Sequence, residues 1–132
     1  MQDTTTARLL AHKPQIQRPL RLLTWALLAL GLVVAAWPSM PEVNISHADK
    51  YMHMLAFFGF AFLLDISDTR SFWRYKVPIL LGYGALIEII QAFLPWRSFD
   101  PLDWVADASG VLLYWLVWYV VLRPLLATKL KT

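Results

Sequence analysis

Apolar residues gather in four long stretches of the chain, separated by short segments rich in charge and proline. The stretches cover residues 22–37, 51–64, 77–94 and 104–122. About 20 apolar residues are needed to cross a hydrocarbon core as a helix. The first, third and fourth stretches approach this length, and the second reaches it if residues 48–50 and 65–66 extend the same helix. The pattern therefore predicts an all-α membrane protein, a four-helix transmembrane bundle.

Prolines and short acidic residues mark the expected ends of these helices. Pro38 follows the first stretch, and proline cannot continue a helical hydrogen-bond ladder. We expect Asp49 to cap the second helix, Asp65 to lie in the turn after it, and Pro124 to end the last helix. This gives a cytoplasmic arm over residues 1–19, the transmembrane domain over residues 20–123, and a cytoplasmic tail over residues 124–132.

The distribution of lysine and arginine orients this bundle. Ten of the twelve basic residues fall on one side of the expected membrane, and only Lys50 and Arg97 fall on the other. The ten are Arg8, Lys13, Arg18, Arg21, Arg70, Arg74, Lys76, Arg123, Lys129 and Lys131. Because cytoplasmic loops carry the excess of lysine and arginine, both termini are predicted to lie in the cytoplasm, an N-in/C-in topology. We expect a multi-pass protein of the bacterial cytoplasmic (inner) membrane.

The amino-acid composition agrees with a membrane protein and excludes several other kinds of function. The chain of 132 residues is 58% hydrophobic and 16% charged, whereas soluble domains are about 45–50% apolar and about 25% charged. The absence of cysteine excludes disulfides, thiolate catalysis and cysteine-based metal sites. The net charge of +3 is explained by topology, so no nucleic-acid partner is expected.

The first apolar stretch has a second interpretation. A basic segment, an apolar run and the small residues Val34, Ala35 and Ala36 loosely resemble a cleavable signal peptide. The basic segment is long, and Pro38 lies just after the point of cleavage. We therefore expect this helix to be retained, and an intact N-terminus in the mass of the purified protein would verify that.

Three ionisable residues lie inside the expected helices at a similar depth on the extracytoplasmic side. His53 and Asp107 each lie about one turn into their helices, and Glu88 lies about 9 Å below the end of its helix, at 1.5 Å per residue. Ionisable groups at such depth cost about 2.5–3.5 kcal/mol on insertion scales and normally face protein or water. We therefore expect them to form a functional site. The alternative is that His53 is a buried imidazole that only holds the helices together.

Spacing within the helices supports this convergence. Asp49 and His53 are four residues apart, so the carboxylate is expected to orient the imidazole. Asp103 and Asp107 repeat this spacing, and Glu88 lies three residues from Gln91. In the loop 95–101, Arg97 is expected either to clamp Asp100 or Asp103, or to bind a phosphate or carboxylate of a ligand.

Several motifs in this region resemble those of the VanZ-like family. Residues 49–53 are similar to a D-K-x-x-H motif, residues 88–91 to E-x-x-Q, and residues 95–103 to P-x-R-x-x-D-x-x-D. Asp107 and Gly110 stand in the places of N-x-x-G, with Asp in place of the expected Asn. The resemblance covers roughly residues 20 to 122. It implies a small integral membrane protein of the bacterial cell envelope, and an association with teicoplanin (glycopeptide) resistance, without naming a reaction.

These features favour a protein that recognises an amphiphilic ligand at the extracytoplasmic face. The expected partner is a membrane lipid headgroup or a lipid-linked cell-wall intermediate. The ligand-binding residues on this hypothesis are Asp49, Lys50, Gln91, Arg97, Asp100, Asp103 and Asp107. The second hypothesis is an enzyme in which His53, polarised by Asp49, acts as general base and Glu88 as general acid on a lipid-linked substrate.

Two further hypotheses are less favoured. Transport of ions through Glu88 and Asp107 requires ionisable residues in the cytoplasmic half of the bundle, and none is expected there. A divalent metal held by His53, Glu88, Asp103 and Asp107 is chemically reasonable, but no spacing in the sequence is characteristic of such a site. No cofactor or metal is therefore predicted.

Overall fold

The protein is built from helices throughout the described part of the chain. The computed structural model describes residues 14–38, 47–68 and 70–129. Its elements are α2 (Pro14–Ala36), α3 (Ala48–Ser67), the π-helical segment η1 (Phe72–Lys76), α4 (Val77–Ala92), α5 (Pro101–Trp115), the π-helical segment η2 (Leu116–Leu122) and α6 (Arg123–Lys129). The all-α fold class and the four helical regions expected from the sequence are confirmed.

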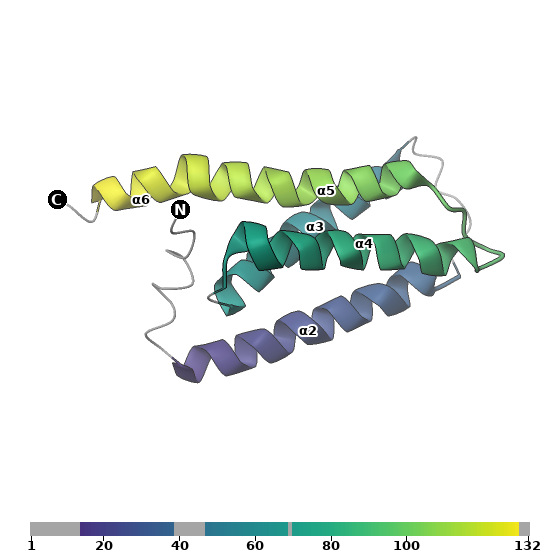
Figure 1. The fold of residues 1–132 in the computed structure, drawn as a ribbon, viewed down its shortest axis with the longest axis horizontal. Coiled ribbons are helices and arrows are strands. Elements are labelled where there is room, and N and C mark those ends of the chain that lie inside the picture. The colour runs from purple at the N-terminus through teal and green to yellow at the C-terminus, as the bar shows by residue number, and fades with distance from the viewer. Residues whose placement is uncertain (1–13, 39–46, 69, 130–132) are drawn as a thin grey trace.

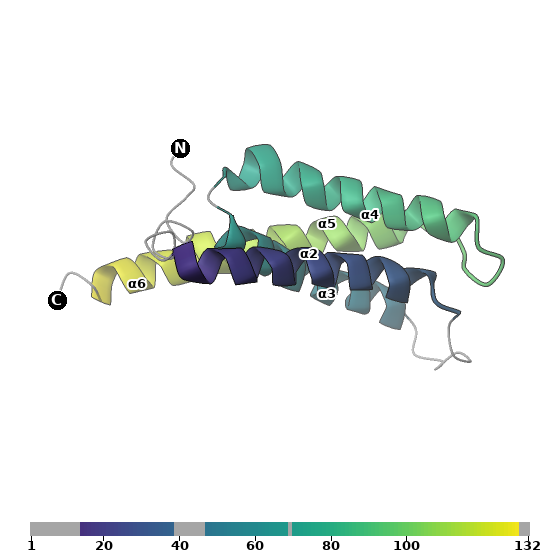
Figure 2. The same cartoon turned by 90° about the horizontal axis from the view of Figure 1, so that it is seen from below.

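These elements form four rods that run in alternating directions (Figure 1). The rods are α2, α3, η1 with α4, and α5 continued through η2 into α6. The start of α3 and the loop between α4 and α5 lie at one end of the bundle, which we call the site end. The start of α2, the end of α3 and the end of α6 lie toward the other, which we call the opposite end (Figures 1 and 2).

Helix α2 is fastened to the rest of the bundle by hydrogen bonds to its backbone carbonyls. The Tyr83 hydroxyl donates to the Leu28 carbonyl at 2.6 Å. Gly31 provides room for this contact, since a Cβ there would lie 2.5 Å from the Tyr83 hydroxyl. Closer to the site end, Gln91 Nε2 donates to the Ala35 carbonyl at 3.1 Å. The sequence predicts a helix from the uncharged stretch over residues 22–37, and in the structure this helix is an integral part of the bundle.

Helices α3 and α5 form the tightest pair, because a glycine lies at their crossing. A Cβ on Gly110 would collide with the backbone carbonyl oxygen of Met54. Small residues at such crossings let helix backbones approach closely, which is how helices associate in membranes. Gly84 has a similar role toward the Asp107 side chain, whereas Gly82 has nothing within 4 Å of its Cβ position.

The opposite end contains a buried ion pair that the sequence did not reveal. Lys76 Nζ lies 2.7 Å from Asp65 Oδ1, and both side chains are 1% exposed. The Tyr114 hydroxyl donates to Asp65 Oδ2 at 2.6 Å, and the Tyr119 hydroxyl also contacts this carboxylate. The expectation that Asp65 lies in a turn was wrong, because α3 runs on to Ser67. The expectation of no ionisable residue in this half was wrong as well.

The last rod also runs further than expected. Pro124 was expected to end the helix, but it lies in the first turn of α6, which continues to Lys129. The preceding segment η2 has π-helical hydrogen bonding, and such wider turns commonly accompany an interruption of the regular ladder. The boundary expected at residue 123 therefore does not coincide with a helix end. In the same way, α2 begins at Pro14 and contains Pro19.

The surface of the bundle is largely apolar and its interior is partly polar. The buried polar and charged residues are Thr24, Asp65, Ser67, Asp68, Lys76, Glu88, Gln91, Asp103 and Asp107, as many as the buried apolar ones. Large apolar side chains on all four rods face outward, for example Leu22 on α2, Leu55 on α3, Ile89 on α4 and Leu112 on α5. Among the described residues, two helices, Gln15–Ala36 and Pro101–Leu125, are long and apolar enough to cross a membrane.

Candidate functional site

The site begins where α5 starts, because Asp100 and Pro101 fix that helix terminus. Asp100 is the N-cap residue, and its Oδ1 accepts a hydrogen bond from the Leu102 amide at 2.9 Å. Pro101 occupies the first helical position, where its missing N–H is not needed. This start directs Asp103 and Asp107, one turn apart, into the bundle toward α3, where both are buried. The four-residue spacing seen in the sequence therefore produces two inward carboxylates.

Lys50 on the first turn of α3 joins the two acidic residues nearest the surface. Its Nζ donates to Asp100 Oδ2 at 2.7 Å and to Asp103 Oδ1 at 3.3 Å. The hydrogen bond from Lys50 holds the pKa of the Asp100 carboxyl below its ordinary value of 3.8. Asp100 is therefore ionised at neutral pH. The clamp that the sequence assigned to Arg97 is made by Lys50.

His53 lies one turn further along α3 and contacts both buried aspartates. Its Nδ1 lies 2.7 Å from Asp107 Oδ1, and its Nε2 lies 3.8 Å from Asp103 Oδ2. The expectation that Asp49 orients the imidazole was wrong, since Asp49 is exposed and the imidazole turns into the bundle toward Asp107. Asp49 is four residues away on the same helix, but its side chain is exposed, whereas α5 places Asp107 against the buried imidazole.

Glu88 approaches the same cluster from α4 and is only partly satisfied. Its side chain is 2% exposed. Oε2 accepts a hydrogen bond from the Asp100 amide at 3.2 Å, whereas Oε1 is buried with no hydrogen-bond partner among the described residues. Asp107 Oδ2 is likewise buried with no hydrogen-bond partner among the described residues. Two buried carboxylate oxygens in one cluster thus have no hydrogen-bond partner in the described part of the chain.

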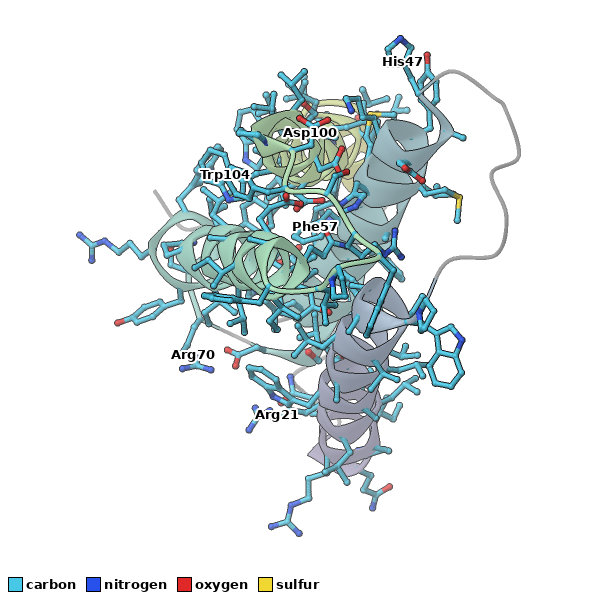
Figure 3. The ribbon with its side chains drawn as sticks, turned by 90° about the vertical axis from the view of Figure 1, so that its right-hand side faces the viewer. Arg21, His47, Phe57, Arg70, Asp100 and Trp104 are labelled. Atoms are coloured by element: carbon cyan, nitrogen blue, oxygen red, sulfur yellow. The ribbon has the colours of Figure 1, made fainter. Side chains whose placement is uncertain are left out.

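A pocket of about 240 Å³ opens beside Glu88 between α4 and α5. Its walls are apolar and aromatic, and Glu88 is the one charged residue among them. The lining residues are Ala85, Glu88, Ile89, Phe99, Pro101 and Trp104. Figure 3 looks onto this end of the bundle, with Trp104 between α4 and α5, Asp100 over the start of α5 and Phe57 near the centre. The indole Nε1 of Trp104 donates to the Leu81 carbonyl at 3.0 Å, which fixes this wall.

Two residues expected at the site have other positions. Gln91 is buried, and its amide is engaged with Ala35 of α2. Arg97 lies in the α4–α5 loop, where its Nε is buried without a partner and its side chain forms no ion pair with the described residues. A ligand-binding role for Arg97 stays a prediction.

The residues that line the pocket were not predicted from the sequence. Ala85, Phe99 and Trp104 are ordinary apolar residues in a membrane protein, and nothing in their spacing distinguishes them from residues that face lipid. The helical repeat offers one signal, because Ala85 precedes Glu88 by three residues and Trp104 precedes Asp107 by three residues. These neighbours of site residues become pocket walls once α4 and α5 pair.

Comparison with known proteins gives the family. No curated protein and no solved structure matched the chain. A family model described as VanZ/LLP1 matches residues 6–123, which span all of the site residues and both long apolar helices. Since the match covers most of the chain, this membrane protein belongs to the VanZ/LLP1 family.

Proposed function

We propose that the protein crosses the cytoplasmic membrane four times and binds an amphiphilic ligand at its extracytoplasmic face. The observation that supports this most strongly is the pocket between α4 and α5, which has apolar walls and lies beside the buried, half-satisfied carboxylate of Glu88. Pockets for small ligands combine such walls with a few polar groups that fix orientation. The sequence alone indicated a ligand at this end but no cavity.

The four-span arrangement is supported by the direction of the rods and by their surface. Chain ends at the start of α2 and the end of α6 lie toward the same end of the bundle (Figure 1). Helix α3 has 20 residues and so a length of about 30 Å, the thickness of a hydrocarbon core. Apolar side chains that face outward on α3 and α4 are suited to lipid and not to water. The ten basic residues then place the site end outside the cell.

The chemistry at the pocket favours a ligand with an anionic headgroup and an apolar part. Arg97 supplies a cationic group in the loop above, and its fork of donors matches phosphate or carboxylate oxygens. The unpartnered oxygen of Glu88 suits a hydroxyl or amide of the same headgroup. Ile89, Phe99 and Trp104 then hold an acyl or polyprenyl segment. A phospholipid or a lipid-linked cell-wall intermediate has this combination, and the second would connect the protein to teicoplanin tolerance.

Filling the pocket tests this proposal. An Ala85→Phe substitution places a ring in the cavity, and the protein and its variant are purified from bacterial membranes in mild detergent and examined by native mass spectrometry. We expect an anionic amphiphile to remain bound to the wild type and to be lost from Ala85→Phe, and to be weakened by Arg97→Ala. The matched control is Ala92→Phe, at an exposed position of α4 outside the pocket lining. Equal lipid retention in all four proteins would contradict the proposal.

A second function, an enzyme on the same ligand, is favoured by the contact between His53 and Asp107. A carboxylate 2.7 Å from Nδ1 orients an imidazole for proton transfer through Nε2, and Glu88 lies within reach of the same space. An enzyme would turn over a lipid-linked substrate, and His53→Ala and Glu88→Gln would abolish that turnover. If the bound ligand is recovered chemically unchanged after incubation, the enzyme function is contradicted and only the binding function remains.

A further inference from the structure

We infer that His53, Glu88 and Asp103 form a binding site for one divalent transition-metal cation. Each of the three residues offers a ligand atom, and these atoms all lie within 4.8 Å of one another. They come from three helices, α3, α4 and α5. This explains why no spacing in the sequence indicated a metal: the site exists only when the bundle assembles.

The separations are close to those of a coordinated cation. Bonds from zinc to nitrogen and oxygen ligands are about 2.0–2.2 Å, so ligand atoms on one ion lie roughly 3–3.5 Å apart. His53 Nε2 and Asp103 Oδ2 are 3.8 Å apart. A contraction of a few tenths of an ångström therefore brings these two atoms onto one ion, and the Glu88 oxygen, within 4.8 Å of both, reaches it by a larger rotation of its side chain.

The contact with Asp107 prepares the imidazole for this role. An ionised carboxylate only accepts hydrogen bonds, so His53 Nδ1 carries a proton and donates it to Asp107 Oδ1. A neutral imidazole with that tautomer keeps its lone pair on Nε2, which faces Asp103. Histidine ligands in metal sites usually have such a carboxylate partner on the other ring nitrogen. Asp103 is prepared in the same manner, because Lys50 engages Oδ1 and leaves Oδ2 toward His53.

Two independent features show that the cluster lacks positive charge. Glu88, Asp100, Asp103 and Asp107 are four carboxylates, whereas Lys50 and His53 are the basic groups that contact them among the described residues. With all four carboxyl groups ionised, the surplus is two or three negative charges, depending on the proton of His53. The second feature is Glu88 Oε1, which is buried and has no partner in the described part of the chain. A cation at the centre satisfies both, since buried charges must be paired or coordinate a metal.

The ligand set indicates the kind of metal. One imidazole with two carboxylates suits Zn²⁺ or Mn²⁺, whereas Ca²⁺ requires six to eight oxygen ligands. Three protein ligands leave a coordination position open, as in sites that bind a further molecule. Glu88 is also a lining residue of the pocket, so the metal site lies beside the proposed ligand site. The metal site does not depend on that ligand, because the cation alone is the species to be measured.

Metal titration of the delipidated protein in detergent tests the site. After removal of metal with a chelator, Zn²⁺ and Mn²⁺ are titrated by calorimetry, bound metal is counted after gel filtration, and Co²⁺ is added as a spectroscopic substitute. We expect one ion per chain. Glu88→Gln, Asp103→Asn and His53→Ala should each lower the affinity at least 100-fold, and Asp107→Asn, which acts through His53, about 10- to 100-fold. Far-ultraviolet circular dichroism shows whether each variant keeps its helices.

Asp49→Asn is the matched control, since Asp49 is exposed on the same helix, one turn from His53. Its affinity should equal that of the wild type. Failure of the wild type to bind either metal stoichiometrically would overturn the inference. Equal loss in Asp49→Asn and His53→Ala, or binding unchanged in the Glu88→Gln and Asp103→Asn proteins, would also overturn it, because the metal would then be held elsewhere. Lipid retention is measured in a separate experiment, so a negative result there does not change the outcome of the metal titration.

Discussion

Replacing Lys76 with methionine would leave a buried carboxylate without its cation at the opposite end of the bundle. Lys76 Nζ is 2.7 Å from Asp65 Oδ1 and 3.2 Å from the Asp65 carbonyl oxygen, and both side chains are 1% exposed. Methionine has a similar length and no charge. The substitution therefore removes one partner of a buried pair and changes the packing little.

The expected loss of stability is large. Removing one partner from a buried ion pair costs about 3–5 kcal/mol, because the other charge stays buried. Because the hydroxyls of Tyr114 and Tyr119 still contact Asp65, we expect a loss of about 3 kcal/mol, at the lower end of this range. For a chain of this size that corresponds to a fall in melting temperature of roughly 10 °C. The double variant Lys76→Met with Asp65→Asn removes both charges and keeps an acceptor for the tyrosines, so it should regain at least half of the loss.

Thermal unfolding in detergent, followed by circular dichroism, measures these differences. Arg74→Met is the matched control, because Arg74 lies two residues away on η1 and is exposed, and its melting temperature should be close to that of the wild type. A Lys76→Met protein that melts within about 2 °C of the wild type would refute the argument, given the conversion above. So would a double variant less stable than Lys76→Met alone.

Three further results are expected. Gly110→Ala should lower the free energy of unfolding by about 1–3 kcal/mol in thermal melts, because its Cβ meets the Met54 carbonyl, whereas Gly82→Ala, with open space, should not destabilise the protein. The pKa of Asp100 is held below 3.8, so the stabilisation from its ion pair with Lys50 is present at neutral pH and is lost only as the pH falls through that lowered pKa. In Lys50→Met, carboxyl NMR should show a higher pKa of Asp100 than in the wild type. An unchanged pKa would exclude the ion pair. Because the chain has no cysteine, Ser98→Cys should react with a membrane-impermeant maleimide in intact cells and Thr128→Cys only after permeabilisation, and the reverse pattern would contradict the orientation.

The parts of the fold that follow from local pattern could be predicted from the sequence. The four apolar stretches each correspond to a helical region of the structure. The inward position of Asp103 and Asp107 follows from a spacing of four residues, because that spacing alone puts both carboxylates on one helix face. Helix ends were less well predicted, since Asp65 and Pro124 normally favour turns but lie within helices here.

Partners across helices could not be predicted, because they depend on how the rods rotate and pair. The sequence argument gave His53 the carboxylate of Asp49, one turn away on the same helix, whereas burial against α5 gives it Asp107. Lys50 makes the contacts with Asp100 and Asp103 that were one of two roles expected for Arg97, because the first turn of α3 packs beside the start of α5. Lys76 counts as a loop charge in a topology argument, yet it is buried against a residue eleven positions earlier.

A structure determined in native lipid would test the central claim most directly, namely that the pocket beside Glu88 holds an amphiphile. Single-particle imaging of the protein extracted with its own membrane, with mass spectrometry of the same sample, gives both the position and the identity of a bound molecule. We expect a headgroup between Arg97 and Glu88, and its apolar part along Ile89, Phe99 and Trp104. A pocket closed by its own side chains, with ordered lipid only on the outer surface of the rods, would contradict the account.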